Sequence, residues 1–284
     1  MKPSKTKVVL LGTGNPNPDP KHNGCSLIVL VDDTPYIVDF GAGLVRQAAA
    51  LTSQYGGKLK DLKIKDLSTA FLTHMHSDHT IGYPDLILTP WIMGRDKPLE
   101  VYGPDGIAEM TEHILMAYQD DIKYRVYGLE PTNNEGWRVN AHEIKEGQIY
   151  EDANISVEAF LVEHGTMPNA YGFRFTTPDK VIVISGDTVP CENIVKYGQG
   201  ADILIHEVYS KRGFDRKDDL WKSYHASHHT STYELAEIAN KTKPRLLVLY
   251  HVLFWGSTNE EILEEIAEKY GGKVIIGEDL DIIE

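Results

Sequence analysis

Apolar residues recur along the chain with two periods, one typical of strands and one typical of helices. Short runs rich in valine, isoleucine and leucine alternate with segments in which the apolar positions lie three and four residues apart. In the helix expected over 105–118, Ile107, Met110, Ile114 and Tyr118 would share a core-facing side. The alternation continues from end to end and predicts an α/β fold. Strands are expected at 7–11, 25–31, 35–39, 67–73, 99–102, 155–162, 171–176, 180–185, 202–206, 245–250 and 273–276. Helices are expected at 43–54, 105–118, 190–197, 230–241 and 259–269.

The chain shows no long linker, low-complexity segment or tandem repeat, so a single domain over residues 1–284 is predicted. Two stretches, 128–152 and 208–229, are rich in glycine, asparagine, lysine and aspartate and are expected to be excursions from the sheets. A capping box at Ser231 and Glu234 is expected to open the helix over 230–241.

The net charge of the chain limits the classes of partner that it can bind. The 42 acidic and 28 basic side chains give a net charge of −14, and the lysines are scattered, which disfavours extended nucleic acid without excluding it. We expect no membrane span, because no apolar stretch is long enough. Residues 1–7 lead into the first strand without the apolar segment of a secretory signal, so a cytoplasmic location is expected. Cys25 and Cys191 are too few for a disulfide framework and are expected to be reduced.

The largest concentration of possible metal ligands lies directly after the expected strand 67–73, where residues 74–79 read His-Met-His-Ser-Asp-His. Side chains two positions apart in an extended segment share a face, so His74 and His76 could bind one metal ion while Asp78 and His79 turn toward a second. Imidazole nitrogen and carboxylate oxygen suit zinc, with manganese and iron left open. The alternative is a surface loop that is histidine-rich without function.

Six residues cannot saturate two ions, so further donors are expected at the ends of other strands. His164, Asp187 and His251 each lie shortly beyond an expected apolar strand. The open end of a sheet is where functional side chains gather. These three residues are therefore candidates to complete the metal site.

The chain resembles the metallo-β-lactamase fold superfamily, whose five sequence motifs it carries in order. They are Asp39, residues 74–79, His164, Asp187 and His251. The resemblance implies an αββα sandwich of two mixed β-sheets flanked by helices, with two divalent metal ions. It assigns His74, His76 and His164 to one ion, Asp78, His79 and His251 to the other, and Asp187 to both. Asp39 is expected to accept a hydrogen bond beside the metal loop and to fix it. The best-known β-lactamases carry a cysteine in place of Asp187, so a lactam substrate is not favoured.

Two further segments resemble ribonuclease Z and its arylsulfatase and phosphodiesterase relatives. They are His206-Glu207-Val208 and the helix opening at His229-Thr230-Ser231-Thr232. The resemblance implies that His229 reaches the phosphate or sulfate of the substrate and that Glu207 orients His229. The alternative for His229 is a plain residue at a helix start, and His206, His225 and His228 are each compatible with a scaffold role.

Bacterial ribonuclease Z carries a long arm between the positions of His164 and Asp187, which here are only 23 residues apart. This departure favours a hydrolase of a small phosphodiester or sulfate ester. A water shared by the two ions would ionise near neutral pH and attack the ester, steered by Asp78. The alternatives are a ribonuclease Z-type endonuclease that processes tRNA 3′ ends, a lactone or thioester hydrolase, and a non-enzymatic metal scaffold. The expected partner is a small anionic ester, and the resemblance suggests a homodimer.

Overall fold

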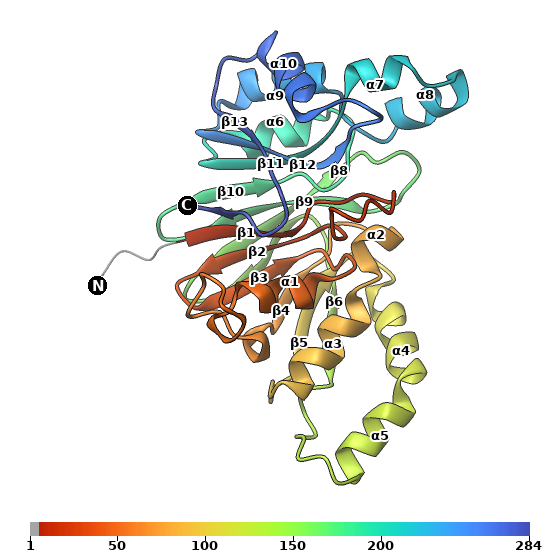
Figure 1. Ribbon diagram of the computed structural model, residues 1–284, viewed down its shortest axis with the longest axis vertical. Coiled ribbons are helices and arrows are strands. Elements are labelled where there is room, and N and C mark those ends of the chain that lie inside the picture. Colours follow the sequence, from red (N-terminus) through yellow and green to blue (C-terminus); the bar gives the residue numbers. More distant parts are fainter. Residues whose placement is uncertain (1–5) are drawn as a thin grey trace. The chain divides into compact units, whose positions relative to one another are not determined.

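The computed structural model describes residues 6–284, which divide into two compact units (Figure 1). The N-terminal unit holds the described residues up to Ile144 together with Glu278–Glu284, and the C-terminal unit holds Lys145–Gly277. Residues 1–5, part of the segment in which no secretory signal was expected, lie outside the described residues. The single domain inferred from the sequence stays a prediction.

The N-terminal unit contains a seven-stranded mixed sheet with the order β14-β1-β2-β3-β4-β5-β6. From β14 to β3 neighbouring strands are antiparallel, and from β3 to β6 they are parallel. The carboxyl ends of β3, β4 and β5 therefore meet at one edge, where loops can bring side chains together. The strands are β1 (Thr6–Gly12), β2 (Ser26–Val31), β3 (Thr34–Val38), β4 (Thr69–Phe71), β5 (Leu99–Gly103), β6 (Val139–Glu143) and β14 (Ile282–Ile283).

Five α-helices accompany this sheet. The first contacts β1 and α3, and the fourth contacts β6 and α5. Apolar side chains from the sheet and from the first, third and fourth helices form one buried core cluster. The helices are α1 (Leu44–Leu51), α2 (Ser77–Thr80), α3 (Tyr83–Ile92), α4 (Ile107–Ala117) and α5 (Gln119–Tyr127), with two short 3-10 turns, η1 (Ser53–Tyr55) and η2 (Ile64–Asp66).

Helix α3 forms although it contains a proline near its end. Pro90 has no N–H to donate, so the carbonyl of Leu86 loses its intrahelical partner. The buried guanidinium of Arg95 donates to that carbonyl at 3.1 Å and to the carbonyl of Ile87 at 2.6 Å. Burial lowers the pKa of Arg95 to about 9, and the carbonyl oxygens around it replace its hydration. Arg95 thus satisfies the helix end that the proline leaves open.

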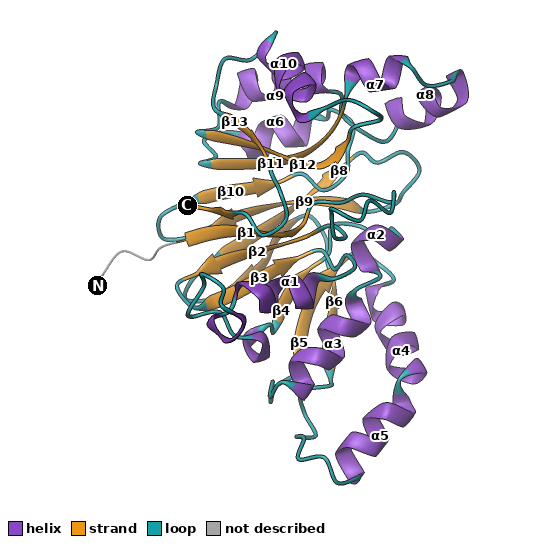
Figure 2. Cartoon of the chain, viewed as in Figure 1, coloured by secondary structure: helices purple, strands orange, loops and turns teal. Residues whose placement is uncertain are grey.

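The C-terminal unit contains a second seven-stranded mixed sheet, ordered β13-β12-β11-β10-β9-β8-β7. Figure 2 draws the strands in orange and the helices in purple. Strands β10 to β13 run parallel, and β7 to β10 are antiparallel. The strands are β7 (Gly147–Glu151), β8 (Ser156–Val162), β9 (Ala170–Thr176), β10 (Val181–Ile184), β11 (Ile203–Tyr209), β12 (Leu246–Leu253) and β13 (Val274–Ile276). The helices are α6 (Glu192–Gly198), α7 (Lys211–Asp215), α8 (Asp219–Ala226), α9 (Thr232–Thr242) and α10 (Asn259–Ala267).

Helix α9 contacts both α6 and α10, all three contact the sheet of their unit, and their apolar sides contribute to its core. The predicted capping box is present at the start of α9, where Ser231 and Glu234 exchange hydrogen bonds. Its caps satisfy the first amide groups of the helix. The start of α9 is therefore fixed, and His229 lies two residues before Ser231.

The predicted fold class, α/β with two mixed β-sheets flanked by helices, is confirmed. The expectation of an excursion at 128–152 is wrong, because this stretch contains β6 and β7, which are strands of the two sheets. The stretch 208–229 does leave the sheet after β11, and it forms the helices α7 and α8. Tyr118 is also misplaced, since it follows α4 as its C-cap and is exposed. Among the helices of residues 6–284, none has the length and apolar character that crossing a bilayer requires.

Candidate metal centre

In the N-terminal unit, a buried carboxylate is hydrogen-bonded to both ends of the segment 73–79. Asp39 follows β3 in the left-handed backbone region, at φ 61°. Its Oδ1 accepts the backbone N–H of Thr73 at 2.8 Å, and its Oδ2 accepts Nδ1–H of His79 at 2.8 Å. A non-glycine residue at positive φ costs about 1–3 kcal/mol and persists where its surroundings hold it. The two hydrogen bonds supply that restraint and fix the ring of His79.

Close backbone approach behind Asp39 depends on a glycine. Gly82, next to α3, donates its N–H to the carbonyl of Phe40 at 2.7 Å. A Cβ built on Gly82 would lie 2.3 Å from the carbonyl oxygen of Gly41, a backbone atom that cannot move away easily. The start of α3 and the segment after β3 therefore come together only because position 82 has no side chain.

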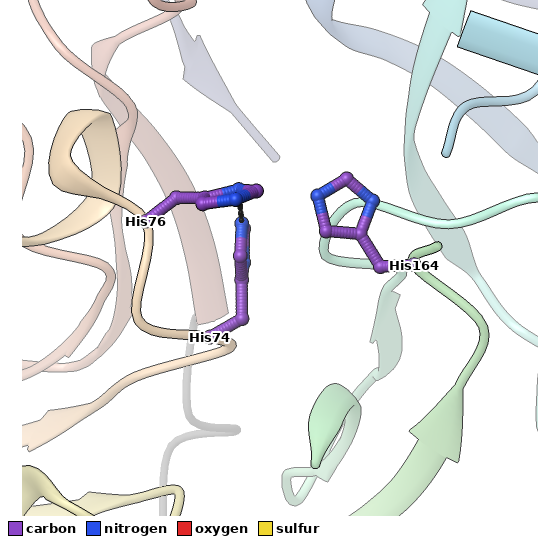
Figure 3. Close-up of side chains that lie close together, drawn as sticks. All are labelled: His74, His76 and His164. Atoms are coloured by element: carbon purple, nitrogen blue, oxygen red, sulfur yellow. Dashed lines mark hydrogen bonds between the residues drawn. The ribbon is translucent and has the colours of Figure 1, made fainter. Parts of the chain in front are cut away.

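Three histidines of this unit lie together at the end of β4. Nδ1 of His74 donates to the hydroxyl oxygen of Thr73 at 3.0 Å, while that hydroxyl donates to Asp39. Nε2 of His74 then lies 3.0 Å from Nδ1 of His76, and Figure 3 shows the two rings joined at these atoms. The rings of His74 and His79 are 4.2 Å apart between centroids.

Two nitrogens 3.0 Å apart fit one ion, because ligand atoms at ~2.1 Å from a metal then subtend about a right angle. Asp78, in the first turn of α2, places Oδ2 3.5 Å from Nε2 of His79. The predicted donors His74, His76, Asp78 and His79 are thus brought together within the N-terminal unit.

In the C-terminal unit, a buried carboxylate lies between two buried imidazoles. Oδ2 of Asp187 is 3.9 Å from Nε2 of His164 and 3.5 Å from Nε2 of His251. Nδ1 of His164 donates to the backbone carbonyl of His228 at 2.7 Å, which leaves Nε2 as its ligand atom. The three predicted donors of this unit therefore gather around one carboxylate.

The backbone aims His251 in a way that the sequence does not indicate. His251 was expected just beyond a strand, but it lies inside β12, which continues to Leu253. The register against β11 shifts there, since Glu207 pairs with Tyr250 and Val208 pairs with Val252. His251 is the extra residue of this bulge and has φ 50°. Bulges redirect single side chains next to functional sites.

Glu207 is a buried carboxylate in the interior of β11. Its Oε1 accepts the N–H of Thr230 at 3.0 Å and the N–H of Thr188 at 3.3 Å, and it lies 3.4 Å from Nδ1 of His229. Burial, and then the negative charge of Asp187, raises the pKa of Glu207. Glu207 thus ties the loop after Asp187 to the loop that carries His229, which is buried beside it.

Three threonines support the candidate donors. Thr230 was predicted only as part of the segment at His229, and none of the three was given a role of its own from the sequence. Thr73, Thr188 and Thr230 each adjoin a candidate donor, either before it or after it. Thr73 bonds Asp39 and His74, and the hydroxyl of Thr230 donates to the carbonyl of Thr188 at 2.7 Å. Their position next to histidine and aspartate is the only signal that the sequence carried.

The donor chemistry fits a divalent ion. In the C-terminal unit, ligand atoms of His164, Asp187 and His229 all lie within 4.8 Å of one another and are buried. In the N-terminal unit, Cys25 lies equally close to Asp39 and His79, so a thiol borders that cluster. No disulfide involves either cysteine of the described chain. Each unit thus contributes imidazole and carboxylate atoms of the type that zinc, manganese and iron accept.

Comparison with known proteins shows which proteins this chain is similar to. A family model described as beta-lactamase superfamily domain matches residues 34–252. A protein of Mycobacterium bovis strain BCG named ribonuclease Z is 31% identical over 284 residues, which cover 98% of each chain. The alignment length and the coverage together mean that this relative is of nearly the same length.

Solved structures show the same fold. The metallo-β-lactamase fold protein YhfI of Bacillus subtilis matches with a TM-score of 0.74 at 17% identity, over 99% of this chain and 100% of that one. The short form of human tRNase Z matches with a TM-score of 0.69 at 21% identity, over 98% of both chains. At these identities the likeness concerns the fold.

Proposed function

Because the chain belongs to the beta-lactamase superfamily, we propose that it is a hydrolase that cleaves phosphodiester bonds with two divalent metal ions. The observation that carries the proposal is the pair of donor clusters, each built from imidazoles and a carboxylate. In both clusters, Nδ1 of a histidine is hydrogen-bonded to the protein, which leaves Nε2 for a metal ion. Second-sphere partners of this kind are typical of metal-binding histidines. Zinc is the expected ion, and manganese or iron would accept the same atoms.

The proposed ligands are the seven residues singled out in the sequence. His74, His76 and His164 would hold one ion, Asp78, His79 and His251 the other, and Asp187 both. When bound, the ions supply a nucleophile from water at neutral pH and polarise the phosphoryl oxygens.

The protein's own groups would orient the ester. His229, next to Glu207, is placed to donate a hydrogen bond to a non-bridging oxygen or a proton to the leaving oxygen. Its hydrogen bonds to Thr188 and Thr230 make Glu207 a positioning residue that holds the loops on either side. Asp78 lies in α2 with a side chain that is only 9% exposed, and it is proposed to steer the attacking water.

RNA is the substrate that the relatives favour. A protein of matching length, 31% identical, is named ribonuclease Z, and this identity is too extensive to reflect the fold alone. We therefore propose endonucleolytic cleavage of RNA, with precursor tRNA as the first substrate to test. The short interval between His164 and Asp187 remains the feature of this chain that favours a smaller ester.

A small phosphodiester is the second candidate, and the charge of the chain favours it. A net charge of −14 weakens long-range attraction of a polyanion, while a small ester needs only the local charge of the site. Sulfate, lactone and thioester hydrolysis are less favoured on this chemistry.

One comparison separates these substrates. The metal-loaded protein would be assayed on precursor tRNA with a 3′ extension, bis-p-nitrophenyl phosphate, an aryl sulfate, a lactone and a thioester. Cleavage of the tRNA at one position, abolished by chelation, supports the ribonuclease. Rapid cleavage of the small diester with intact tRNA supports the second candidate. Hydrolysis confined to the sulfate, lactone or thioester contradicts phosphodiester cleavage.

We also infer a homodimer from the family resemblance. Light scattering of the purified protein tests it, and the mass of one chain at micromolar concentration would contradict it.

A further inference from the structure

A group of aromatic rings lies at the surface of the C-terminal unit, on the helices that follow β11. Trp221 and Tyr224 of α8 are 51% and 41% exposed, and Trp255, after β12, is half-buried. Single exposed rings are common on soluble proteins, whereas a cluster of rings on one surface more often marks a binding site. We call Trp221, Tyr224 and Trp255 the aromatic platform.

The platform is held in place before any ligand arrives. Asp218 caps α8 by accepting the N–H of Trp221 at 3.0 Å. The ring of Trp221 stacks on His225, with centroids 5.5 Å apart and planes at 21°, and Tyr224 stacks on His228 at 4.1 Å and 24°. Rings that are already ordered lose little conformational freedom on binding.

Ring contacts connect the platform to the candidate metal centre within the same unit. His225, which carries Trp221 on one side, is 4.3 Å from the ring of Trp255 and 5.8 Å from the ring of His229. His228, under Tyr224, accepts the hydrogen bond of His164 through its carbonyl oxygen. The platform therefore begins one ring away from the group proposed to contact the scissile ester.

The local charge suits an anionic ligand although the whole chain is acidic. Residues 211–222 carry five basic and three acidic side chains, but Lys211 pairs with Asp215, and Arg212 pairs with Glu264 and Glu268. The cation that lies beside the rings is Lys217. Nζ of Lys217 lies 4.3 Å from the ring centre of Trp255 and 6.0 Å from that of Trp221. An ammonium group beside aromatic faces is the combination that single-stranded nucleic acid binds, with bases on rings and phosphates on cations.

We propose that Trp221 and Tyr224 stack a nucleobase adjacent to the scissile phosphodiester, with Lys217 beside the phosphate chain. The substrate is then a nucleotide ester or an RNA with an unpaired base next to the cleaved bond. This inference rests on the proposed phosphodiester hydrolysis for the identity of the bond, while base binding itself needs no turnover. A base inside a helical stem, stacked on both faces by neighbouring base pairs, would have no face free for the rings.

Binding is measured by calorimetry with adenosine 5′-monophosphate and ribose 5-phosphate, which carry the same phosphate and differ by the base. The wild type should bind the nucleotide more tightly. Trp221→Ala should weaken the nucleotide about 5- to 150-fold, as expected when one stacked ring is removed, and leave ribose 5-phosphate unchanged. Trp221→Phe should retain most of the preference. Leu220→Ala is the matched control, since Leu220 is 80% exposed on the same helix and has no ring.

Equal affinity for the two ligands, or equal loss of both in Trp221→Ala, would overturn the platform. A lower molecular mass of Trp221→Ala in light scattering would also overturn it, since the rings would then pack against a second copy of the chain. Turnover of thymidine 5′-p-nitrophenyl phosphate and methyl p-nitrophenyl phosphate is followed separately. Base preference with no hydrolysis of either ester contradicts the proposed function and leaves the platform standing. Hydrolysis of the esters without base preference contradicts the platform and leaves the proposed function standing.

Discussion

Replacing Asp39 by asparagine isolates one charge at the candidate metal centre. Asparagine tolerates the left-handed backbone that Asp39 adopts, so the substitution adds little strain. The carboxylate accepts the N–H of Thr73 through one oxygen and Nδ1–H of His79 through the other. An amide has a single oxygen, so in either orientation its NH₂ group faces another donor. His79 can relieve the conflict by moving its proton to Nε2, the nitrogen needed for the metal.

The magnitude follows from the lost interaction. A hydrogen bond to a charged group contributes ~1.5–3 kcal/mol, which corresponds to about 10- to 150-fold in an equilibrium constant. Loss of second-sphere partners of metal-binding histidines typically costs about 10- to 100-fold in affinity or activity. We therefore expect Asp39→Asn to weaken zinc or manganese binding by about 10- to 100-fold.

The assay is competition with a chromogenic chelator, followed by kcat on a phosphodiester. Asp32→Asn is the matched control, because Asp32 also has positive φ, at 52°, and is exposed in the turn after β2. Wild-type metal affinity in Asp39→Asn, or an equal loss in the control, would refute the role given to this carboxylate.

Four further changes test separate parts of the account. His229→Ala should lower kcat about 100-fold or more with metal content unchanged, and wild-type kcat would remove its proposed role. His74→Ala should lower the metal content found by mass spectrometry, and full occupancy would exclude it as a ligand. Gly82→Ala should lower the unfolding free energy by ~1–3 kcal/mol in urea titrations, because its Cβ meets the Gly41 carbonyl; unchanged stability would contradict this contact. Burial lowers the pKa of His206 to about 4, below the unfolded value of 6.5. Since the unfolded state then protonates first, stability of the metal-free protein should fall between about pH 6.5 and 4, with a smaller slope in His206→Gln.

Much of the fold was readable because apolar periodicity reports burial directly. The parallel strands β10 to β12 are almost continuous apolar runs, and the capping box of α9 is a local signal. Helix α3 escaped prediction because Pro84 and Pro90 look like helix breakers, while Arg95, which satisfies the opened carbonyl, lies outside the pattern. The segments that form α7 and α8 are polar, so they lack the apolar periodicity from which a helix is predicted.

The candidate donors were readable for a different reason. Histidines and aspartates that are close together in the sequence indicate metal binding by their residue type alone. The expected ends of the strands then predict where these residues meet. The bulge that aims His251 and the position of Glu207 inside β11 depend on strand register, which a single sequence does not reveal. The threonines that hold the donors were missed because a hydroxyl beside a histidine has many ordinary uses.

The central claim is that this chain holds two divalent ions at the seven proposed ligands. Mass spectrometric metal analysis of the protein, after reconstitution with zinc or manganese and removal of excess ion, tests it most directly. The account predicts about two equivalents per chain, in keeping with a bimetallic hydrolase. A protein that keeps its fold and retains no stoichiometric metal would contradict it.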